Sequence, residues 1–307
     1  MTPCAVRKGD HLPVYRESKA EPAAFTVGER NRQTICQAVS MEGVALFSGD
    51  LVKVLFLPTE RPGIYFRRVD LPGKPYLRAS IEHLIATPRC TIIGEGFVRV
   101  QCVEHVLSAV AALSIDDLII ELDGNEPPIF DGSSSKFVQM LENAGVQSVD
   151  RMQQVFYLQE AVYVDDGGSQ MIALPSKSLK FSCTIAYPGR EILSSQFYSL
   201  ELTKESYIRD IAPCRTFALA QEVKELVHKG ILKSASLDHG VVVDGSKILN
   251  PDGLRFSNEM VRHKILDMIG DFALIGAPVC AHFIAICSGH ALNAKLSKLI
   301  YAHLMEN

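Results

Sequence analysis

The segment that most constrains the fold runs from Val261 to Asp271 and is a predicted helix with a polar stripe. On a helix, His263, Asp267 and Asp271 stand at i, i+4 and i+8, so they share one face, while the opposite side is aliphatic. An imidazole and a carboxylate one turn apart can bind the same metal ion, and the second carboxylate can orient a neighbouring group. The alternative is a solvated helix face, because charged residues at four-residue spacing are common on protein surfaces.

The composition argues against nucleic-acid binding and against a membrane-spanning segment. The 307 residues suggest two domains, and the formal net charge of -4 gives no electrostatic reason to bind nucleic acid. Eight cysteines are scattered without a C-x-x-C pair, a pattern typical of reduced thiols in a cytosolic protein. The polar N-terminus lacks the apolar core of a signal peptide, and the most apolar run, 272–287, is too interrupted to cross a bilayer. We therefore expect a cytoplasmic protein that would meet a lipid substrate by peripheral contact with the inner membrane surface.

The order of the predicted elements favours an α+β fold with two similar domains. Residues 1–32 lack periodicity and are interpreted as a loosely ordered extension. In each of the two halves, 33–149 and 150–307, short strands are followed by a helix, a strand and a second helix. We expect each half to lay its two helices on a sheet. The predicted helices are 102–113, 135–144, 204–209, 221–229, 257–275 and 291–305, and 117–122 is a predicted strand.

Two further stretches carry polar groups next to predicted helices. Glu104-His105 opens a helix in the first half, and Ser288-Gly289-His290 lies between a strand and a helix in the second. Two histidines and one carboxylate form the ligand set of a catalytic zinc site, and ligands from both halves would place the ion in a cleft between them. Taken separately, Glu104-His105 is better explained as a pair at a helix N-terminus, and His290 could be a helix cap. The assignment therefore depends on the three stretches together.

Turnover at such a site also needs groups that accept and donate protons. Glu104, adjacent to His105, is the candidate proton acceptor. His290 is the candidate protonated imidazole, which could stabilise an oxyanion or protonate a leaving amine. Asp271 would keep that imidazole charged, because a nearby carboxylate raises the pKa of a histidine.

Six motifs follow one another along the chain: Val103-Glu104-His105, Phe130-Asp131-Gly132-Ser133, Arg215-Thr216-Phe217, Asp252-Gly253-Leu254-Arg255-Phe256, the Arg262–Asp271 stretch and Ser288-Gly289-His290-Ala291-Leu292-Asn293. In this combination the chain resembles the UDP-3-O-acyl-N-acetylglucosamine deacetylase family, the zinc amidases of lipid A synthesis in Gram-negative bacteria. The resemblance extends from about Gln33 to the C-terminus. It implies two similar domains packed helix layer to helix layer, with the active site between them.

The resemblance implies a role for each matching residue. Three residues would bind Zn²⁺: His105, His263 and Asp267. Three would move protons or orient the group that does: the general base Glu104, the general acid His290 and its partner Asp271. Thr216 would help to polarise the substrate carbonyl, and Lys264 and Phe217 would contact the substrate, although Lys264 taken alone is explained as a surface lysine. The expected reaction removes acetate from a nucleotide-sugar lipid, the committed step of lipid A biosynthesis, in a protein expected to be a monomer.

The family also carries an insert in each domain, a small sheet in the first and a β-α-β acyl passage in the second. Here the passage would lie at about 219–243, which is predicted to contain a helix, a glycine turn and a strand. Four positions match the lining of the passage: Leu232, Ala235, Ser236 and Val242. Val223, Leu226 and Val227 give the helix an apolar face, and packing of this face on the second domain is the favoured interpretation for those three residues.

Two positions depart from the family pattern. Phe47 replaces a histidine near the substrate path, and Cys287 replaces a lysine that would contact the diphosphate. Two other functions stay open: a zinc amidohydrolase acting on another N-acyl sugar, and a binding protein in which zinc only joins the two halves. The second would have no use for a general base, and a structural zinc normally has four protein ligands.

Overall fold

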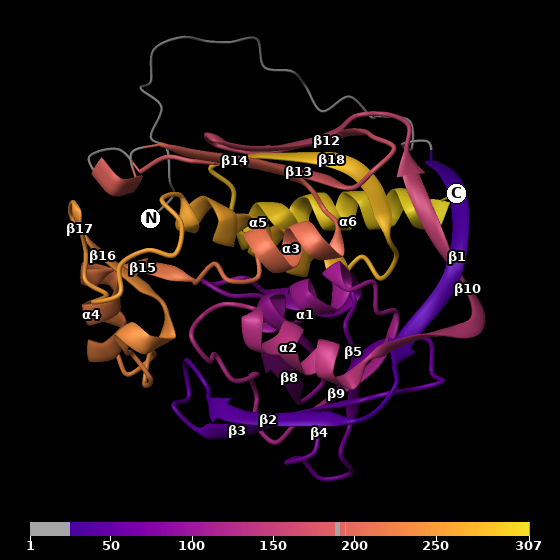
Figure 1. Cartoon of the computed structure of the whole chain (residues 1–307), viewed down its shortest axis with the longest axis horizontal. Helices are drawn as coiled ribbons and strands as arrows, with labels where there is room; N and C mark the ends of the chain where they lie inside the picture. The colour runs from indigo at the N-terminus through magenta and orange to yellow at the C-terminus, as the bar shows by residue number, and fades with distance from the viewer. Residues whose placement is uncertain (1–24, 188–190, 194, 307) are drawn as a thin grey trace.

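The computed structural model describes residues 25–187, 191–193 and 195–306, which form the α+β fold expected from the sequence (Figure 1). The helices are α1 Val103–Ala112, α2 Ser135–Ala144, α3 Lys204–Asp210, α4 Ala220–His228, α5 Glu259–Ala273 and α6 His290–Glu306, with short 3-10 turns η1 Ile81–His83, η2 Glu191–Leu193 and η3 Leu237–His239. The strands are β1 Phe25–Ile35, β2 Val39–Val44, β3 Leu51–Leu57, β4 Gly63–Arg68, β5 Tyr76–Arg78, β6 Leu84–Ala86, β7 Ile92–Glu95, β8 Val98–Gln101, β9 Asp117–Leu122, β10 Val146–Leu158, β11 Val162–Asp166, β12 Ser169–Pro175, β13 Lys180–Ile185, β14 Gln196–Glu201, β15 Phe217–Leu219, β16 Val241–Asp244, β17 Lys247–Ile248 and β18 Val279–Ile286.

A twelve-stranded sheet contains strands from both halves of the chain, and the two halves repeat one strand order. In the first half the order is β2, β3, β9, β4, β5, with β4 and β9 parallel and the other neighbours antiparallel. In the second half the order is β11, β12, β18, β13, β14, and β13 and β18 are the parallel pair. Parallel neighbours need a crossover connection, which contains α1 in the first half and α5 in the second. These two helices therefore occupy equivalent places.

Strands β1 and β10 join the two halves of the sheet. They pair antiparallel, from Phe25 opposite Leu158 to Ile35 opposite Val146. One expectation is corrected here. Residues 25–32, which were assigned to a loosely ordered extension, belong to β1, because they are ordered by pairing with a distant strand that local periodicity does not reveal. The expected boundary between residues 149 and 150 falls inside β10, and residues 1–24 lie outside the described part of the chain.

Helices occupy the space between the two halves of the sheet. Figure 1 shows α1 and α2 on the side of β2, β3, β4 and β9, and α3, α5 and α6 on the side of β12, β13, β14 and β18. Helix α1 packs against α5, and the crossing is close because Gly270 has no side chain: a Cβ there would lie 2.0 Å from the backbone oxygen of Glu104. His263, Asp267 and Asp271 are at most 3% exposed, so the alternative of a solvated helix face is wrong.

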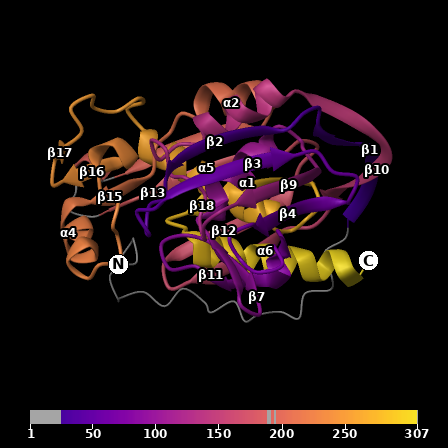
Figure 2. The same cartoon turned by 90° about the horizontal axis from the view of Figure 1, so that it is seen from below.

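Two small sheets stand beside the main one. Strands β6, β7 and β8 form the first, and β15, β16 and β17 form the second. β15 and β16 are parallel and are connected through α4, so residues 217–244 form a β-α-β unit. Figures 1 and 2 both place this unit at one end of the molecule and β1 with β10 at the other.

The predicted helices agree with the structure within two residues at each end, and α2 and β9 have the predicted bounds. Six strands of the described residues were not predicted: β2, β5, β6, β14, β15 and β17. Among the described residues, no helix combines the length and apolar character needed to cross a bilayer. Six cysteines of the described ranges are free thiols: Cys36, Cys90, Cys102, Cys183, Cys214 and Cys280.

Candidate active site

The predicted metal ligands meet where α1 crosses α5. His105 lies in the first turn of α1, and His263 and Asp267 lie one turn apart on α5. Each residue offers one ligand atom, and the three atoms lie within 4.8 Å of one another. The Nε2 atoms of His263 and His105 are 3.2 and 3.9 Å from Oδ1 of Asp267. Because all three side chains are buried, this cluster could hold one metal ion away from bulk water.

The protonation states of these side chains suit metal binding. Nδ1 of His263 lies 3.0 Å from the carbonyl oxygen of Cys214, which fixes the proton on Nδ1 and leaves the lone pair of Nε2 free. Burial, and then the neighbouring His263, lowers the pKa of His105 to about 3, so its imidazole is neutral. Burial opposes ionisation of Asp267, but Lys264 and His263 outweigh it and hold the pKa of Asp267 well below its usual range. The neutral imidazole of His105, Nε2 of His263 and the carboxylate of Asp267 are donors that zinc accepts.

Glu104 precedes His105 on α1, and its carboxyl group is buried beside the ligand cluster. Its Oε2 atom accepts a hydrogen bond of 3.0 Å from the backbone N–H of Thr91. Burial, with repulsion from Asp271 and Asp267, raises the pKa of Glu104 to about 7, although His290 opposes the shift. A carboxyl group with such a pKa can take up and release a proton near neutral pH.

His290 begins α6 and faces the same point from the other side. Its Nδ1 atom donates to Oδ2 of Asp271 at 2.9 Å, and the same oxygen accepts from Nδ2 of Asn293 at 2.8 Å. Burial opposes the charge on His290, but Asp271 and Asp267 outweigh it and raise the pKa of His290 to about 10. Its Nε2 atom is 3.9 Å from both Oε1 of Glu104 and Oδ2 of Asp267. A protonated imidazole, a carboxyl group and a metal ligand therefore converge on one small volume.

Three further predicted residues lie between this cluster and the β-α-β unit. Nζ of Lys264 donates to Oδ2 of Asp267 at 2.8 Å and lies 5.5 Å from the ring centroid of Phe217, so Lys264 is not the free surface lysine of the alternative interpretation. The backbone N–H of Thr216 donates to the oxygen of Gly132 at 2.8 Å, and its oxygen accepts from Val241 at 2.7 Å. Thr216 and Phe217 both line the cavity described next.

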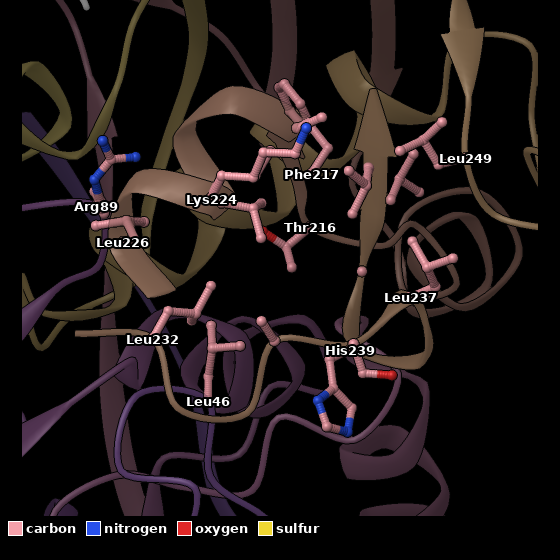
Figure 3. A pocket seen from close by; sticks show the side chains of 18 of the residues that line it. Leu46, Arg89, Thr216, Phe217, Lys224, Leu226, Leu232, Leu237, His239 and Leu249 are labelled. Carbon is pink, nitrogen blue, oxygen red and sulfur yellow. The ribbon is translucent and has the colours of Figure 1, made fainter. Parts of the chain in front are cut away.

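A cavity of about 350 Å³ occupies the β-α-β unit (Figure 3). Its lining is largely aliphatic and includes the four residues that match the family's passage: Leu232, Ala235, Ser236 and Val242. Val223 and Leu226 also line it, so packing on the second domain was the wrong interpretation for these two side chains. Val227, on the same helix, is 47% exposed and is not part of the lining.

The first half of the chain supplies one wall of this cavity. Leu46 and Phe47 line it, and their backbone oxygens accept hydrogen bonds of 3.3 Å from the N–H groups of Ser234 and Lys233. In Figure 3, Leu46 and Leu232 are drawn on the same side of the cavity, which both residues line. Phe47, one of the two departures from the family pattern, therefore adds an aromatic ring to the cavity wall. Cys287, the other departure, is only 2% exposed.

Several residues of the sequence motifs form ion pairs beside the site. Arg215 is buried and donates from Nε to Glu259 at 2.8 Å, and its NH1 lies 2.9 Å from Asp252. Arg255 pairs with Asp131 at 2.8 Å. These ion pairs tie the motif segments to the start of α5. The sequence did not indicate Thr91 or Arg89 as site residues, since neither belongs to a motif. Thr91 contacts Glu104 and Asp271, and Arg89 lines the cavity.

The chain is similar throughout the described region to known deacetylases. The family model described as UDP-3-O-acyl N-acetylglycosamine deacetylase matches residues 32–302. A protein named UDP-3-O-acyl-N-acetylglucosamine deacetylase from Myxococcus xanthus (strain DK1622) is 39% identical over 271 residues, covering 88% of this chain and 86% of the relative. Proteins of the same name from Campylobacter fetus subsp. fetus (strain 82-40) and Chlamydia pneumoniae are 40% and 37% identical, covering 86% and 89% of this chain and 89% and 97% of their own.

Proposed function

Because the chain belongs to the UDP-3-O-acyl N-acetylglycosamine deacetylase family, we propose that the site at the α1–α5 crossing performs the deacetylation. The enzyme hydrolyses the N-acetyl amide of UDP-3-O-acyl-N-acetylglucosamine and releases acetate and UDP-3-O-acyl-glucosamine for lipid A biosynthesis. The observation that carries the assignment is the convergence of a raised-pKa carboxyl group, a protonated imidazole and three ligand groups beside an apolar cavity. An apolar cavity of this size favours an acylated sugar over an N-acyl sugar without a fatty chain.

His105, His263 and Asp267 would hold a zinc ion. The fit is supported by the donor set, by the neutral state of the His105 imidazole and by the hydrogen bond that orients His263 through Cys214. A zinc ion supplies Lewis acidity and acidifies a water molecule when it is bound there. Three protein ligands leave a position open, as catalytic zinc sites require, which speaks against a purely structural ion.

Glu104 would act as the general base. It takes one proton from the attacking water, and the O–C bond to the acetyl carbon forms as that proton leaves. The N–H of Thr91 holds one carboxylate oxygen, and the other faces His290 at 3.9 Å. A pKa of about 7 gives the base both a populated ionised form and useful basicity near neutral pH.

His290 would act as the general acid. Its proton passes to the amine nitrogen as the C–N bond breaks, which forms acetic acid and a neutral amine. The acetic acid gives its proton back to His290 and leaves as acetate, and Glu104 releases its proton to solvent. Asp271 keeps the imidazole protonated and fixes its orientation through the hydrogen bond to Nδ1. Thr216 would help to polarise the acetyl carbonyl, and Lys264 and Phe217 would contact the substrate near the opening of the cavity.

The 3-O-acyl chain would occupy the cavity lined by Leu232, Ala235, Ser236 and Val242. We further propose that residues 33–149 and 150–307 form two domains that meet through their helix layers, which the repeated strand order supports. The enzyme would work as a cytoplasmic monomer.

Peripheral contact with the inner membrane would occur through the β-α-β unit. Four large aliphatic residues in and directly after this unit are exposed by 39 to 47%: Val227, Ile231, Leu237 and, after β17, Leu249. Leu237 and Leu249 also line the cavity, so the exposed surface is continuous with the proposed acyl site.

Acetate release from UDP-3-O-acyl-N-acetylglucosamine tests the proposal. Chelation should abolish release, and one equivalent of Zn²⁺ should restore it. Glu104→Gln and His290→Ala should bind zinc but lose on the order of 10²- to 10⁴-fold in rate, the usual cost of removing a positioned acid or base. Full activity of the metal-free protein, or of both variants, would overturn the assignment.

A further inference from the structure

Thr91 makes contacts that join the proposed base to the proposed acid. It immediately precedes β7, and its side chain is 1% exposed. Its backbone N–H donates to Oε2 of Glu104 at 3.0 Å, while its hydroxyl donates to Oδ1 of Asp271 through a short hydrogen bond. The same hydroxyl oxygen lies 3.4 Å from Nδ1 of His290. One residue therefore contacts three groups whose relative placement decides proton transfer.

These contacts cross between the two halves of the chain. Glu104 and Thr91 belong to the first half, whereas Asp271 and His290 belong to the second. Asp271 accepts from His290 and Asn293 at Oδ2, both on α6, and from Thr91 at Oδ1. His290 and Asn293 hold the carboxylate of Asp271 within the second half of the chain. The hydroxyl of Thr91 connects the same carboxylate to the first half, which carries Glu104.

We propose that Thr91 is a positioning residue that holds the Asp271–His290 pair at its working distance from Glu104. This inference rests on the roles proposed above for Glu104 and His290. Misplacement of reacting groups by about 1 Å can cost about 10²-fold in rate, so a residue that touches neither substrate nor metal can control turnover in this way. It also gives the β6–β8 sheet a function, because the residue that leads into β7 is the one that connects the base and the acid.

The hydroxyl can be removed with little change in shape. Thr91→Val keeps the β-branched form and leaves the backbone hydrogen bond to Glu104 in place. We expect kcat to fall roughly 10- to 100-fold, as for the loss of one hydrogen bond to a charged group, with KM and bound zinc unchanged. Thr91→Ser, which retains the hydroxyl, should stay within about threefold of the parent kcat.

A matched control exists in the same half of the chain. Thr34 is also buried, and its hydroxyl donates to the backbone oxygen of Asp117 at 2.7 Å. Thr34→Val makes the same chemical change away from the proposed site. It should lower the melting temperature about as much as Thr91→Val and leave kcat within about twofold.

A double-mutant cycle with Asp271→Asn decides whether the hydroxyl acts through the carboxylate. If it does, Thr91→Val should change kcat by less than about twofold in the Asp271→Asn background, because coupled residues are not additive. Three results would overturn the inference. The effects of Thr91→Val and Asp271→Asn on kcat could be fully additive, Thr91→Val could leave kcat unchanged, or Thr91→Ser could lose as much kcat as Thr91→Val. If Glu104→Gln and His290→Ala are as active as the parent, the proposed function itself fails, which is a separate result.

Discussion

Gly270→Ala is expected to destabilise the protein although it places a better helix former in the middle of α5. On helix propensity alone, alanine would stabilise this position by about 1 kcal/mol. The structure opposes that gain, because the new Cβ would lie 2.0 Å from the backbone oxygen of Glu104, 2.6 Å from its carbonyl carbon and 2.7 Å from its Cα. Ordinary contacts of a Cβ begin at 3.4 Å. All three obstructing atoms belong to the backbone, so no side chain can rotate away.

The difference between 3.4 and 2.0 Å means that α1 and α5 must separate by roughly 1.4 Å at their crossing. Overpacking of a buried contact costs typically about 1–3 kcal/mol, and here the moving atoms are those of the proposed base. We therefore expect a net loss of stability of about 1–3 kcal/mol and a fall in kcat on the order of 10²-fold, since the base moves relative to His290.

Denaturant unfolding and steady-state acetate release measure the two effects. Gly289→Ala is the control, because a Cβ at Gly289 meets no atom within 4 Å and the residue precedes His290 directly. That variant should stay within about 0.5 kcal/mol of the parent in stability. A Gly270→Ala protein that is as stable and as active as the parent would refute the reasoning, because the close crossing would then have no energetic consequence.

Three further predictions address protons, acyl chains and membranes. The proposed base must be ionised and the proposed acid protonated, so kcat/KM should be bell-shaped in pH. Asp271→Asn removes the carboxylate that raises the pKa of His290, so the basic limb of the profile should move to lower pH. A basic limb that does not move contradicts the pairing of Asp271 with His290. Ala235→Gly should shift the deacetylation preference toward longer acyl chains, and Ala235→Leu should shift it toward shorter ones. The relative rate should change about fourfold for each methylene group, because burial of one methylene is worth roughly 0.8 kcal/mol. If an acyl-length series shows no shift, Ala235 does not limit the length of the chain in the cavity. The chain has no tryptophan, so the fluorescence of Ile231→Trp reports on that position alone, and its emission should shift to the blue with anionic phospholipid vesicles. Met152→Trp, on β10 at the opposite end of the molecule, should show no shift. Equal shifts in both variants would refute membrane contact through the β-α-β unit.

The helices and the shared face of the polar residues on α5 were predictable because each has a local signal. The spacing of His263, Asp267 and Asp271 needs only the helical repeat, and Gly145, with a φ of 68°, ends α2 where the sequence indicated. Strand β14 is an edge strand that pairs only with β13 among the described strands, and most of its side chains are half-buried or exposed, so it carries a weak apolar signal. The β1–β10 pairing joins residues more than 100 positions apart, which no local pattern encodes.

Contacts that connect separate segments of the chain could not be predicted from any one of them. Thr91 has no spacing relative to Glu104 or Asp271 that would suggest contact, since its partners come from two different helices. The wall formed by Leu46 and Phe47 likewise depends on backbone hydrogen bonds to residues 233–234. The family pattern drew attention to Phe47 as a departure, but only the fold gives its ring a place in the cavity.

The repeated strand order explains why the site lies where it does. Equivalent crossover helices, α1 and α5, pack against each other, and the polar residues of both are buried at their crossing. The two helices carry different groups there: α1 supplies Glu104 and His105, and α5 supplies His263, Asp267 and Asp271. The repeated architecture thus provides a close, buried contact between two helices, while the differences between their sequences divide the proposed base, acid partner and metal ligands between the halves. Because neither half alone contains the complete set, the catalytic geometry depends on the packing of α1 on α5, which is why a single methyl group at Gly270 is expected to affect both stability and turnover.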